Sequence, residues 1–200
     1  MLGIRSGFTR MSIVGVILLS LMGFSLPAAL AATNSSQAGA GAAAPAAAPP
    51  GAYTIYKELP CRCYNGQTAI AYRVGYYVPP DTGFGHKKVL LKHNMYTPVV
   101  AFIVKGPHNS HTNGKAGEAY AYAYHFVGGV LRQQIKIWAK YDTRKLRDNH
   151  SFGIVTAFCN GYTVCPQWVN QAINAQALPV SAASSTQPDG TRLGYSSRTS

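Results

Sequence analysis

Histidines and a few carboxylates are the side chains of this sequence best suited to acid–base chemistry. The candidates are His108, His111, Glu118, His125 and His150, with Arg132 or Lys136 as nearby cations. A histidine titrates near neutral pH and can exchange a proton with a substrate, while a cation can stabilise the charge of a phosphorane-like transition state. This set predicts, as one hypothesis, a secreted nuclease or a nucleic-acid-binding toxin, but it does not indicate which residues would pair.

Other catalytic patterns are missing from the sequence. It has no Ser/His/Asp order, no glycine-rich phosphate cradle and no carboxylate pair suited to glycoside hydrolysis. The segment HNSH, residues 108–111, has a weak spacing for a metal site, and loop histidines are usually just solvated. These absences alone do not exclude an enzyme, and only together with the resemblance given below do they favour a binding protein. We assign no catalytic residue, no metal and no cofactor.

The first 31 residues have the pattern of an export signal. Arg5 and Arg10 form a basic start, an apolar run follows, and Ala-Leu-Ala at 29–31 is a small-residue cleavage site. The mature chain is therefore expected to be secreted or periplasmic. Residues 32–52 are predicted to form an Ala/Pro-rich linker, 53–178 one small binding domain and 179–200 a disordered polar tail. No later apolar run reaches the roughly 18 residues that a transmembrane helix needs.

The mature chain is strongly basic. Without Arg5 and Arg10, 16 Lys and Arg remain against 6 Asp and Glu, which gives a formal charge of +10. Such a charge favours anionic partners, including nucleic acid, acidic glycans and an acidic subunit. The Ala/Pro segment also fits a third class, an envelope or secretion-apparatus structural protein whose arm crosses the envelope.

Four cysteines in an exported chain of this size predict disulfides rather than a zinc site. Cys159 and Cys165 can close a local loop in which Asn160-Gly161 supplies the turn. A bridge between Cys61 and Cys63 would be strained, so these two are expected either to pair elsewhere or to bridge to another chain. Three connectivities are open at this point.

Strand patterns dominate the rest of the domain. We expect strands over 69–78 and 151–159, and a hairpin made of 88–93 and 97–105, with a polar loop between 106 and 117. A short helix is expected from Pro166 onward. These elements predict a mainly β domain with one or two short helices.

The segment 119–141 fits two incompatible structures. As a hairpin it turns at Gly128-Gly129, with Val127 facing Val130 and Tyr122 facing Ile135. One side would then bury the aromatic and aliphatic residues Tyr120, Tyr122, Tyr124, Phe126, Leu131 and Ile135. The other side would present His125, Arg132, Lys136, Trp138 and Lys140 over small alanines, a platform suited to single-stranded nucleic acid.

As a helix, the same segment begins at a cap on Thr112 or Asn113 and ends at the two glycines, and a strand returns from residue 130. Alanine is the strongest helix former, and Glu118 lies early, near the positive end of the helix dipole. Local pattern alone does not decide between hairpin and helix.

The order of the elements resembles that of the receptor-binding B subunits of the pertussis-toxin type. The matching segments are the sequence TPVVA at 97–101, the aromatic residues that lead into glycine at 124–129, the strand at 132–137, and GIVTAFCNGYTVC at 153–165. The last of these is similar to the family's final strand and terminal disulfide loop. The resemblance covers roughly residues 67–165.

The resemblance implies a small OB-type barrel with the tyrosine-rich segment as a helix across it. It further implies a ring-shaped oligomer with other toxin subunits, which binds glycans of host glycoproteins or glycolipids. Thr97 matches a sugar-contacting threonine of the family, and Lys92 lies near the position of a sugar-contacting lysine. Tyr96 can offer a ring face to the sugar. The expected function is therefore a secreted glycan-binding toxin subunit.

Overall fold

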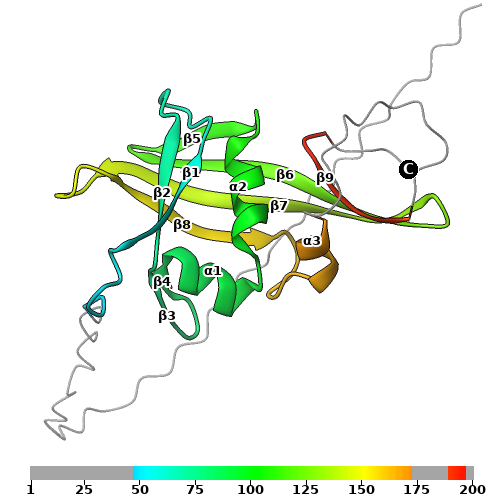
Figure 1. The fold of residues 1–200 in the computed structure, drawn as a ribbon, viewed down its shortest axis with the longest axis horizontal. Coiled ribbons are helices and arrows are strands. Elements are labelled where there is room, and N and C mark those ends of the chain that lie inside the picture. Colours follow the sequence, from blue (N-terminus) through cyan, green and yellow to red (C-terminus); the bar gives the residue numbers. More distant parts are fainter. Residues whose placement is uncertain (1–46, 173–188, 197–200) are drawn as a thin grey trace, which may run out of the picture. The chain divides into compact units, whose positions relative to one another are not determined.

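The computed structural model describes residues 47–172 and 189–196. Figure 1 shows the order of its elements: β1 (Ile55–Pro60), β2 (Ala69–Arg73), β3 (Tyr76–Val78), β4 (Thr82–Phe84), α1 (Gly85–His93), α2 (Thr97–Lys105), β5 (Asn109–Asn113), β6 (Ala116–Val127), β7 (Val130–Lys145), β8 (Ser151–Cys159), α3 (Gln167–Gln171) and β9 (Gly190–Gly194). The strands pair as β1-β2, as β3-β4 and as a five-stranded sheet β5-β6-β7-β8 with β9 beside β6. The domain is mainly β, as predicted, while closure into an OB-type barrel stays a prediction.

The segment 119–141 is a hairpin, so the helix implied by the resemblance is wrong. Strands β6 and β7 pair antiparallel along their length and turn at Gly128 and Gly129. Both glycines have positive φ, 61° and 74°, the conformation that a two-residue hairpin turn requires and that glycine adopts at no steric cost. The turn chemistry and the long-range pairing therefore outweigh the helix propensity of the alanines.

The faces of this hairpin differ from those predicted in two tyrosines of β6: Tyr120 and Tyr122 are partly exposed, whereas Phe126 and Ile135 are buried as predicted. Val127 does face Val130, but the register shifts next to His125. Arg132 therefore has no cross-strand partner on β6, and Tyr122 faces Lys136 instead of Ile135. Because side chains alternate along a strand, one extra residue in β7 changes which residues of β6 lie on the same face as each later residue of β7. Ala121 and Ala123 therefore share the buried face with Ile135 and Ile137, and Tyr120 and Tyr122 share a face with Lys136 and Trp138.

Residues 88–105, predicted as a β-hairpin, form the two helices α1 and α2. Asn94 ends α1 in the left-handed conformation with φ 50°, and a proline in the first turn begins α2. The apolar residues of α2 lie at helical spacing, and all four buried ones are fully covered: Val99, Val100, Ile103 and Val104. A short apolar run fits a buried strand and a buried helix equally well, so periodicity could not separate them.

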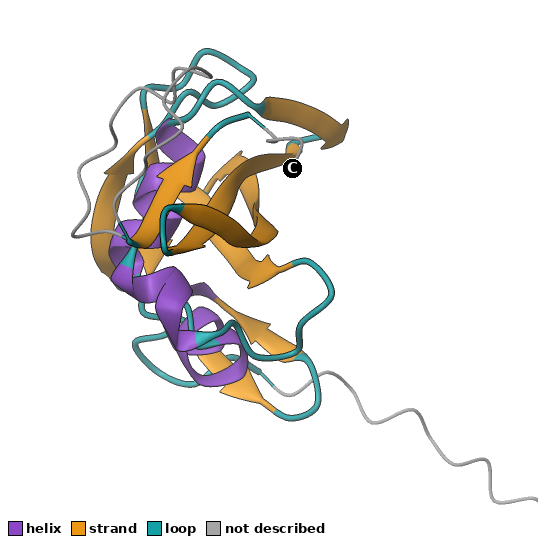
Figure 2. Cartoon of the chain, turned by 90° about the vertical axis from the view of Figure 1, so that its right-hand side faces the viewer, coloured by secondary structure: helices purple, strands orange, loops and turns teal. Residues whose placement is uncertain are grey.

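Helix α2 packs on the alanine face of the sheet. Ala119, Ala121 and Ala123 of β6 are each 0% exposed and belong to one core cluster with α2, together with Ile137 of β7. Figure 2 shows the helices gathered on one side of the sheet. Because alanine has the smallest apolar side chain, three in a row allow the helix to approach the strands closely. The opposite face of the sheet carries no described helix.

The cysteines form two local disulfides. Cys159 pairs with Cys165, as predicted from the turn between them. Cys61 pairs with Cys63, which is one of the connectivities left open, although the strain expected of so short a bridge disfavoured it. All four are buried in the core cluster. Both bridges close short loops within the domain.

Part of the predicted tail belongs to the fold. Residues 190–194 form β9, which pairs antiparallel with β6 and buries Leu193, so the assignment of these residues to a disordered tail is wrong. Their Gly and Thr content does not indicate a strand, and this strand forms because it can pair with β6. At the other end, Ala52 of the predicted linker is buried and its carbonyl accepts a hydrogen bond from Gly75.

Other predictions fall partly or wholly outside the described residues. The export signal and most of the linker do so, as does everything after residue 172 of the helix expected from Pro166. Its first turns are present as α3. None of the helices in the described ranges combines the length and apolar character needed to cross a bilayer.

Candidate functional site

Two of the three residues predicted to bind a glycan line one pocket. Tyr96 and Thr97 lie at the start of α2, where the chain leaves α1, and border a cavity of about 550 Å³. The remaining lining residues come from β1, α1 and α2: Tyr56, Lys57, His86, Leu90 and Pro98. Tyr56 and Tyr96 are large aromatic residues that stay 51% and 41% exposed. Pockets of this size with aromatic walls and a few polar groups are typical small-molecule sites.

Lys92, the third predicted residue, is not among those that line this pocket. Its ammonium group forms an ion pair with Asp81, and the ammonium group of Lys88 lies 3.0 Å from the same carboxylate. Hydrogen bonds from Lys92 and Lys88 lower the pKa of Asp81 to about 2. Residues 88 and 92 follow one another at helical spacing, whereas His86 and Leu90 lie on a different side of α1. The structure thus separates Lys92 from Tyr96 and Thr97.

The wall of the pocket is a stack of aromatic rings. Tyr56 stacks on His86 with ring centroids 4.2 Å apart and planes 10° apart. Tyr72 lies edge-on to both, buried below them. Burial lowers the pKa of His86 and so favours its neutral imidazole, and burial also raises the pKa of the Tyr72 phenol.

Two polar atoms in this stack have no hydrogen-bond partner among the described residues. They are Nδ1 of His86 and the hydroxyl of Tyr72, and both are buried. Buried polar atoms are nearly always paired with protein or ordered water, and leaving one unpaired is costly. These atoms are therefore places where a water molecule or a ligand hydroxyl would be stabilised.

Sequence reasoning missed Tyr56, Lys57 and His86. The segment 53–60 was not recognised as a strand, and His86 stands alone in the sequence between a turn and an apolar run. The exposed tyrosine of β1 reaches the pocket only because β1 packs against α2 and the ring of Tyr56 stacks on that of His86 in the folded chain. Nothing in the local pattern around these residues distinguishes them from ordinary surface residues.

The histidines of the nuclease hypothesis lie in different local environments. His108 stacks on Tyr120, His125 stacks on Trp168, and His111 bonds to the carbonyl of Gly114. One histidine–carboxylate contact is present among these candidates: His150 Nδ1 lies 2.7 Å from Glu58 Oε1, and both side chains are about half exposed. Within the described ranges, no group of three or more His, Cys, Asp and Glu could hold a metal ion.

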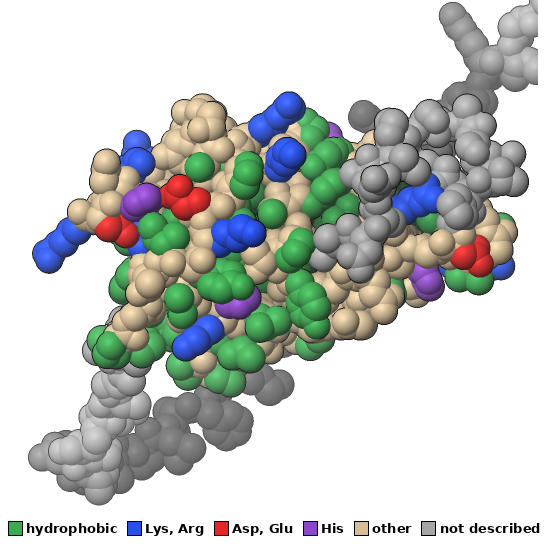
Figure 3. All heavy atoms as spheres, viewed as in Figure 1, with side chains coloured by type: hydrophobic (Ala, Val, Ile, Leu, Met, Phe, Trp, Pro, Cys, Tyr) green, Lys and Arg blue, Asp and Glu red, His purple; other side chains and the backbone are tan. Residues whose placement is uncertain are grey.

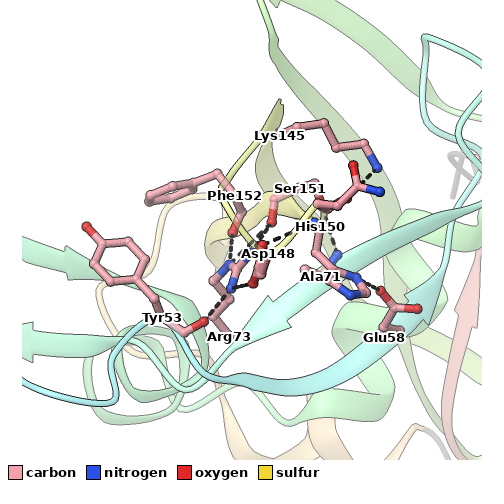
Figure 4. Close-up of polar contacts among 10 residues, drawn as sticks. Tyr53, Glu58, Ala71, Arg73, Lys145, Asp148, His150, Ser151 and Phe152 are labelled. Carbon is pink, nitrogen blue, oxygen red and sulfur yellow. Dashed lines mark hydrogen bonds and ion pairs between the residues drawn. The ribbon is translucent and has the colours of Figure 1, made fainter.

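A buried arginine organises the end of the domain opposite the β6–β7 turn. Arg73 of β2 is 1% exposed, and Figure 4 shows its guanidinium surrounded by acceptors. It donates to the two carboxylate oxygens of Asp148 at 2.7 and 3.1 Å and to three backbone carbonyls, those of Tyr53, Ser151 and Phe152. Although Arg73 also lines a cavity of about 590 Å³, these contacts already use its donors. We read this cluster, the Arg73 clamp, as structural.

The Arg73 clamp predicts a loss of stability at low pH. The hydrogen bonds from Arg73 lower the pKa of Asp148 from 3.8 to about 2. A carboxyl whose pKa is depressed by folding stabilises the fold fully above its unfolded pKa, and this contribution disappears as the pH falls from about 4 towards 2. We expect the stability lost over that range, measured by urea unfolding, to be smaller in Asp148→Asn than in the wild type. Parallel pH profiles for the two proteins would contradict this.

Comparison of the chain with protein-family models, with curated proteins and with solved structures gives no significant match.

Proposed function

We propose that this domain is an exported carbohydrate-binding module, and that the pocket between β1, α1 and α2 holds the sugar. The observation that carries the proposal is the meeting of Tyr96 and Thr97 with the exposed Tyr56 and the stacked His86 around one cavity. Half-exposed aromatic rings next to a hydroxyl are suited to pyranose rings, which present both apolar C–H faces and hydroxyl groups.

Each lining group has a plausible contact with a sugar. The ring faces of Tyr56 and Tyr96 can pack against C–H groups, while the Thr97 hydroxyl can donate to or accept from sugar hydroxyls. Lys57 lines the pocket and can supply the positive charge that was expected from Lys92. Because an ammonium group binds a carboxylate strongly, the pocket should favour an acidic sugar over a neutral one. The unpaired His86 Nδ1 supplies a further hydrogen-bonding atom if a ligand displaces its covering atoms.

The toxin assembly has weaker support than the pocket. The 88–105 hairpin and the tyrosine-rich helix, on which the resemblance to the pertussis-toxin-type B subunits partly rested, are replaced by two helices and a hairpin. The strand at 151–159 with its disulfide loop still fits that resemblance. Membership in a ring with other toxin subunits stays a prediction, and the solution mass of the purified chain measures it.

A glycan array with the mature chain, residues 32–200, tests the pocket. We expect selective binding of acidic oligosaccharides, weakened about fivefold in Tyr56→Ala because roughly 1 kcal/mol of stacking is lost. Lys57→Met should reduce binding of acidic sugars more than of neutral ones. Lys92→Ala is the matched control, since Lys92 does not line the cavity.

Two results would contradict the proposal. The first is a chain that binds no glycan selectively while its circular dichroism shows a folded domain. The second is glycan binding that is unchanged in Tyr56→Ala but lost in Lys92→Ala, which would place the site at the Asp81 end of α1 instead.

A further inference from the structure

The face of the sheet opposite α2 carries both aromatic and lysine side chains. Side chains alternate along a strand, so the residues between the buried alanines of β6 point away from the helices. We define the aromatic–lysine face by its partly or fully exposed members on β6, β7 and β8: Tyr120, Tyr122, Lys136, Trp138, Lys140 and Phe158. It combines large rings with positive charge on one rigid sheet.

The rings form a row that crosses the strands. His108, just before β5, stacks on Tyr120 with centroids 4.5 Å apart and planes 4° apart. The ring of Tyr120 lies 5.2 Å from that of Trp138 across the β6–β7 pair, and Trp138 is paired with Phe158 on β8. Aromatic side chains thus occupy four neighbouring positions across the sheet.

The lysines sit among these rings rather than in ion pairs. The ammonium group of Lys136 lies 3.8 Å from the ring centre of Tyr120 and 4.1 Å from that of Trp138. Lys140 lies over Phe158 at 5.9 Å and is paired across the strands with Glu118 and Thr156. Neither lysine forms an ion pair with a carboxylate in the described ranges. Lys136 in particular faces Tyr122 rather than a carboxylate across the β6–β7 pair, so its charge is available to an anionic ligand.

We propose that the aromatic–lysine face binds single-stranded nucleic acid. A single strand carries one phosphate per nucleotide and exposes flat bases, so it needs both of the features that this face combines. Lys136 and Lys140 have long flexible stems and can turn from the rings to phosphate oxygens, which leaves ring surface of Trp138, Tyr120 and Phe158 for bases. The +10 charge of the mature chain attracts the strand.

This site is separate from the proposed sugar pocket, which lies between β1 and the two helices. Base stacking is tolerant of sequence, so we expect little preference among bases. Duplex nucleic acid keeps its bases stacked internally and should bind more weakly. Acidic polysaccharides share the charge but lack aromatic bases, so they should compete poorly at equal charge.

The test uses the mature chain, residues 32–200, with a fluorescent 15-nucleotide oligothymidylate at several salt concentrations. We expect the double variant Lys136→Gln/Lys140→Gln to bind at least about tenfold more weakly at low salt. Each lost phosphate contact should also reduce the slope of log affinity against log salt by roughly 0.7. The matched control is Lys87→Gln/Lys105→Gln, which removes the same charge from exposed lysines of α1 and α2. Figure 3 shows the face that carries α1 and α2, where the Lys and Arg side chains lie apart from one another.

Tryptophan fluorescence gives a second readout, because charge attraction alone does not quench tryptophan emission. The chain has two tryptophans, so Trp168→Phe leaves Trp138 as the reporter. We expect the oligothymidylate, but not heparin of equal charge, to quench its emission. The inference is overturned if no oligonucleotide binds, if both lysine double variants weaken binding equally, if duplex DNA binds as tightly as the single strand, or if the oligothymidylate binds and leaves Trp138 emission unchanged.

Discussion

Gly153→Ala is expected to lower the free energy of unfolding by about 3 kcal/mol or more, among the largest effects of any single methyl group added to this domain. Gly153 of β8 has φ +100°, which other residues rarely adopt. A Cβ atom there would lie 2.0 Å from the carbonyl oxygen of Ala71 and 2.8 Å from its carbon, both backbone atoms of β2. Because backbone cannot rotate away as a side chain can, β2 and β8 would have to separate. Urea unfolding measures the loss.

The control for this prediction is Gly128→Ala in the β6–β7 turn. Gly128 also has positive φ, +61°, but a Cβ atom there would meet nothing within 4 Å. Its replacement should therefore cost only the left-handed strain, about 1 kcal/mol. Similar losses in the two variants would show that backbone conformation, rather than the close approach of β2 and β8, sets the cost at Gly153.

Arg73→Met is expected to destabilise the domain by about 3 kcal/mol, because it removes the donors of a buried guanidinium and leaves the backbone carbonyls that accept from it without a partner. The methionine keeps much of the side-chain length but none of the donors. The Asp148 carboxylate and the buried carbonyls of Ser151 and Phe152 would then lose the hydrogen bonds that hold β2 against the start of β8. Thermal and urea unfolding of the purified variant measure the loss.

Arg147→Met is the matched control for the Arg73 clamp. Arg147 borders the same cavity but is exposed, so its replacement should change stability by less than about 0.5 kcal/mol. If Arg73→Met were as stable as the wild type, the clamp would be neutral for folding. Arg73 would then have to be reconsidered as a ligand-binding group of the cavity that it lines.

Local patterns were sufficient where a short segment carries its own structural reason. The strand at 151–159 ends in a turn that two cysteines close, and the disulfide between Cys159 and Cys165 was predicted from that spacing alone. Pro166 correctly marked the start of α3. The predicted strand 69–78 is also present, although it divides into β2 and β3 around Gly75, whose positive φ and contact with the Phe84 backbone require a break.

The candidate sites were only partly predictable. Tyr96 and Thr97 were named in advance, but Tyr56 and His86 meet them only because β1 packs against α2 in the folded chain. The aromatic–lysine face was anticipated in its lysines and Trp138, yet the tyrosines were assigned to the buried side. A register shift of one residue caused that error, and no local pattern announces such a shift.

The sequence by itself determined the basic charge and the mainly β class, and it indicated the local Cys159–Cys165 disulfide, because that bridge joins residues that lie close together in the chain. The long hairpin at 119–141 was not decided by local pattern, because a helix fitted the same segment. Tertiary structure decided whether 97–105 is a helix or a strand, which face of β6 is buried and which residues share the pocket. The physical reason is burial: an apolar helix and a row of alanines stabilise each other only when they meet, and that contact joins residues that are distant in the sequence.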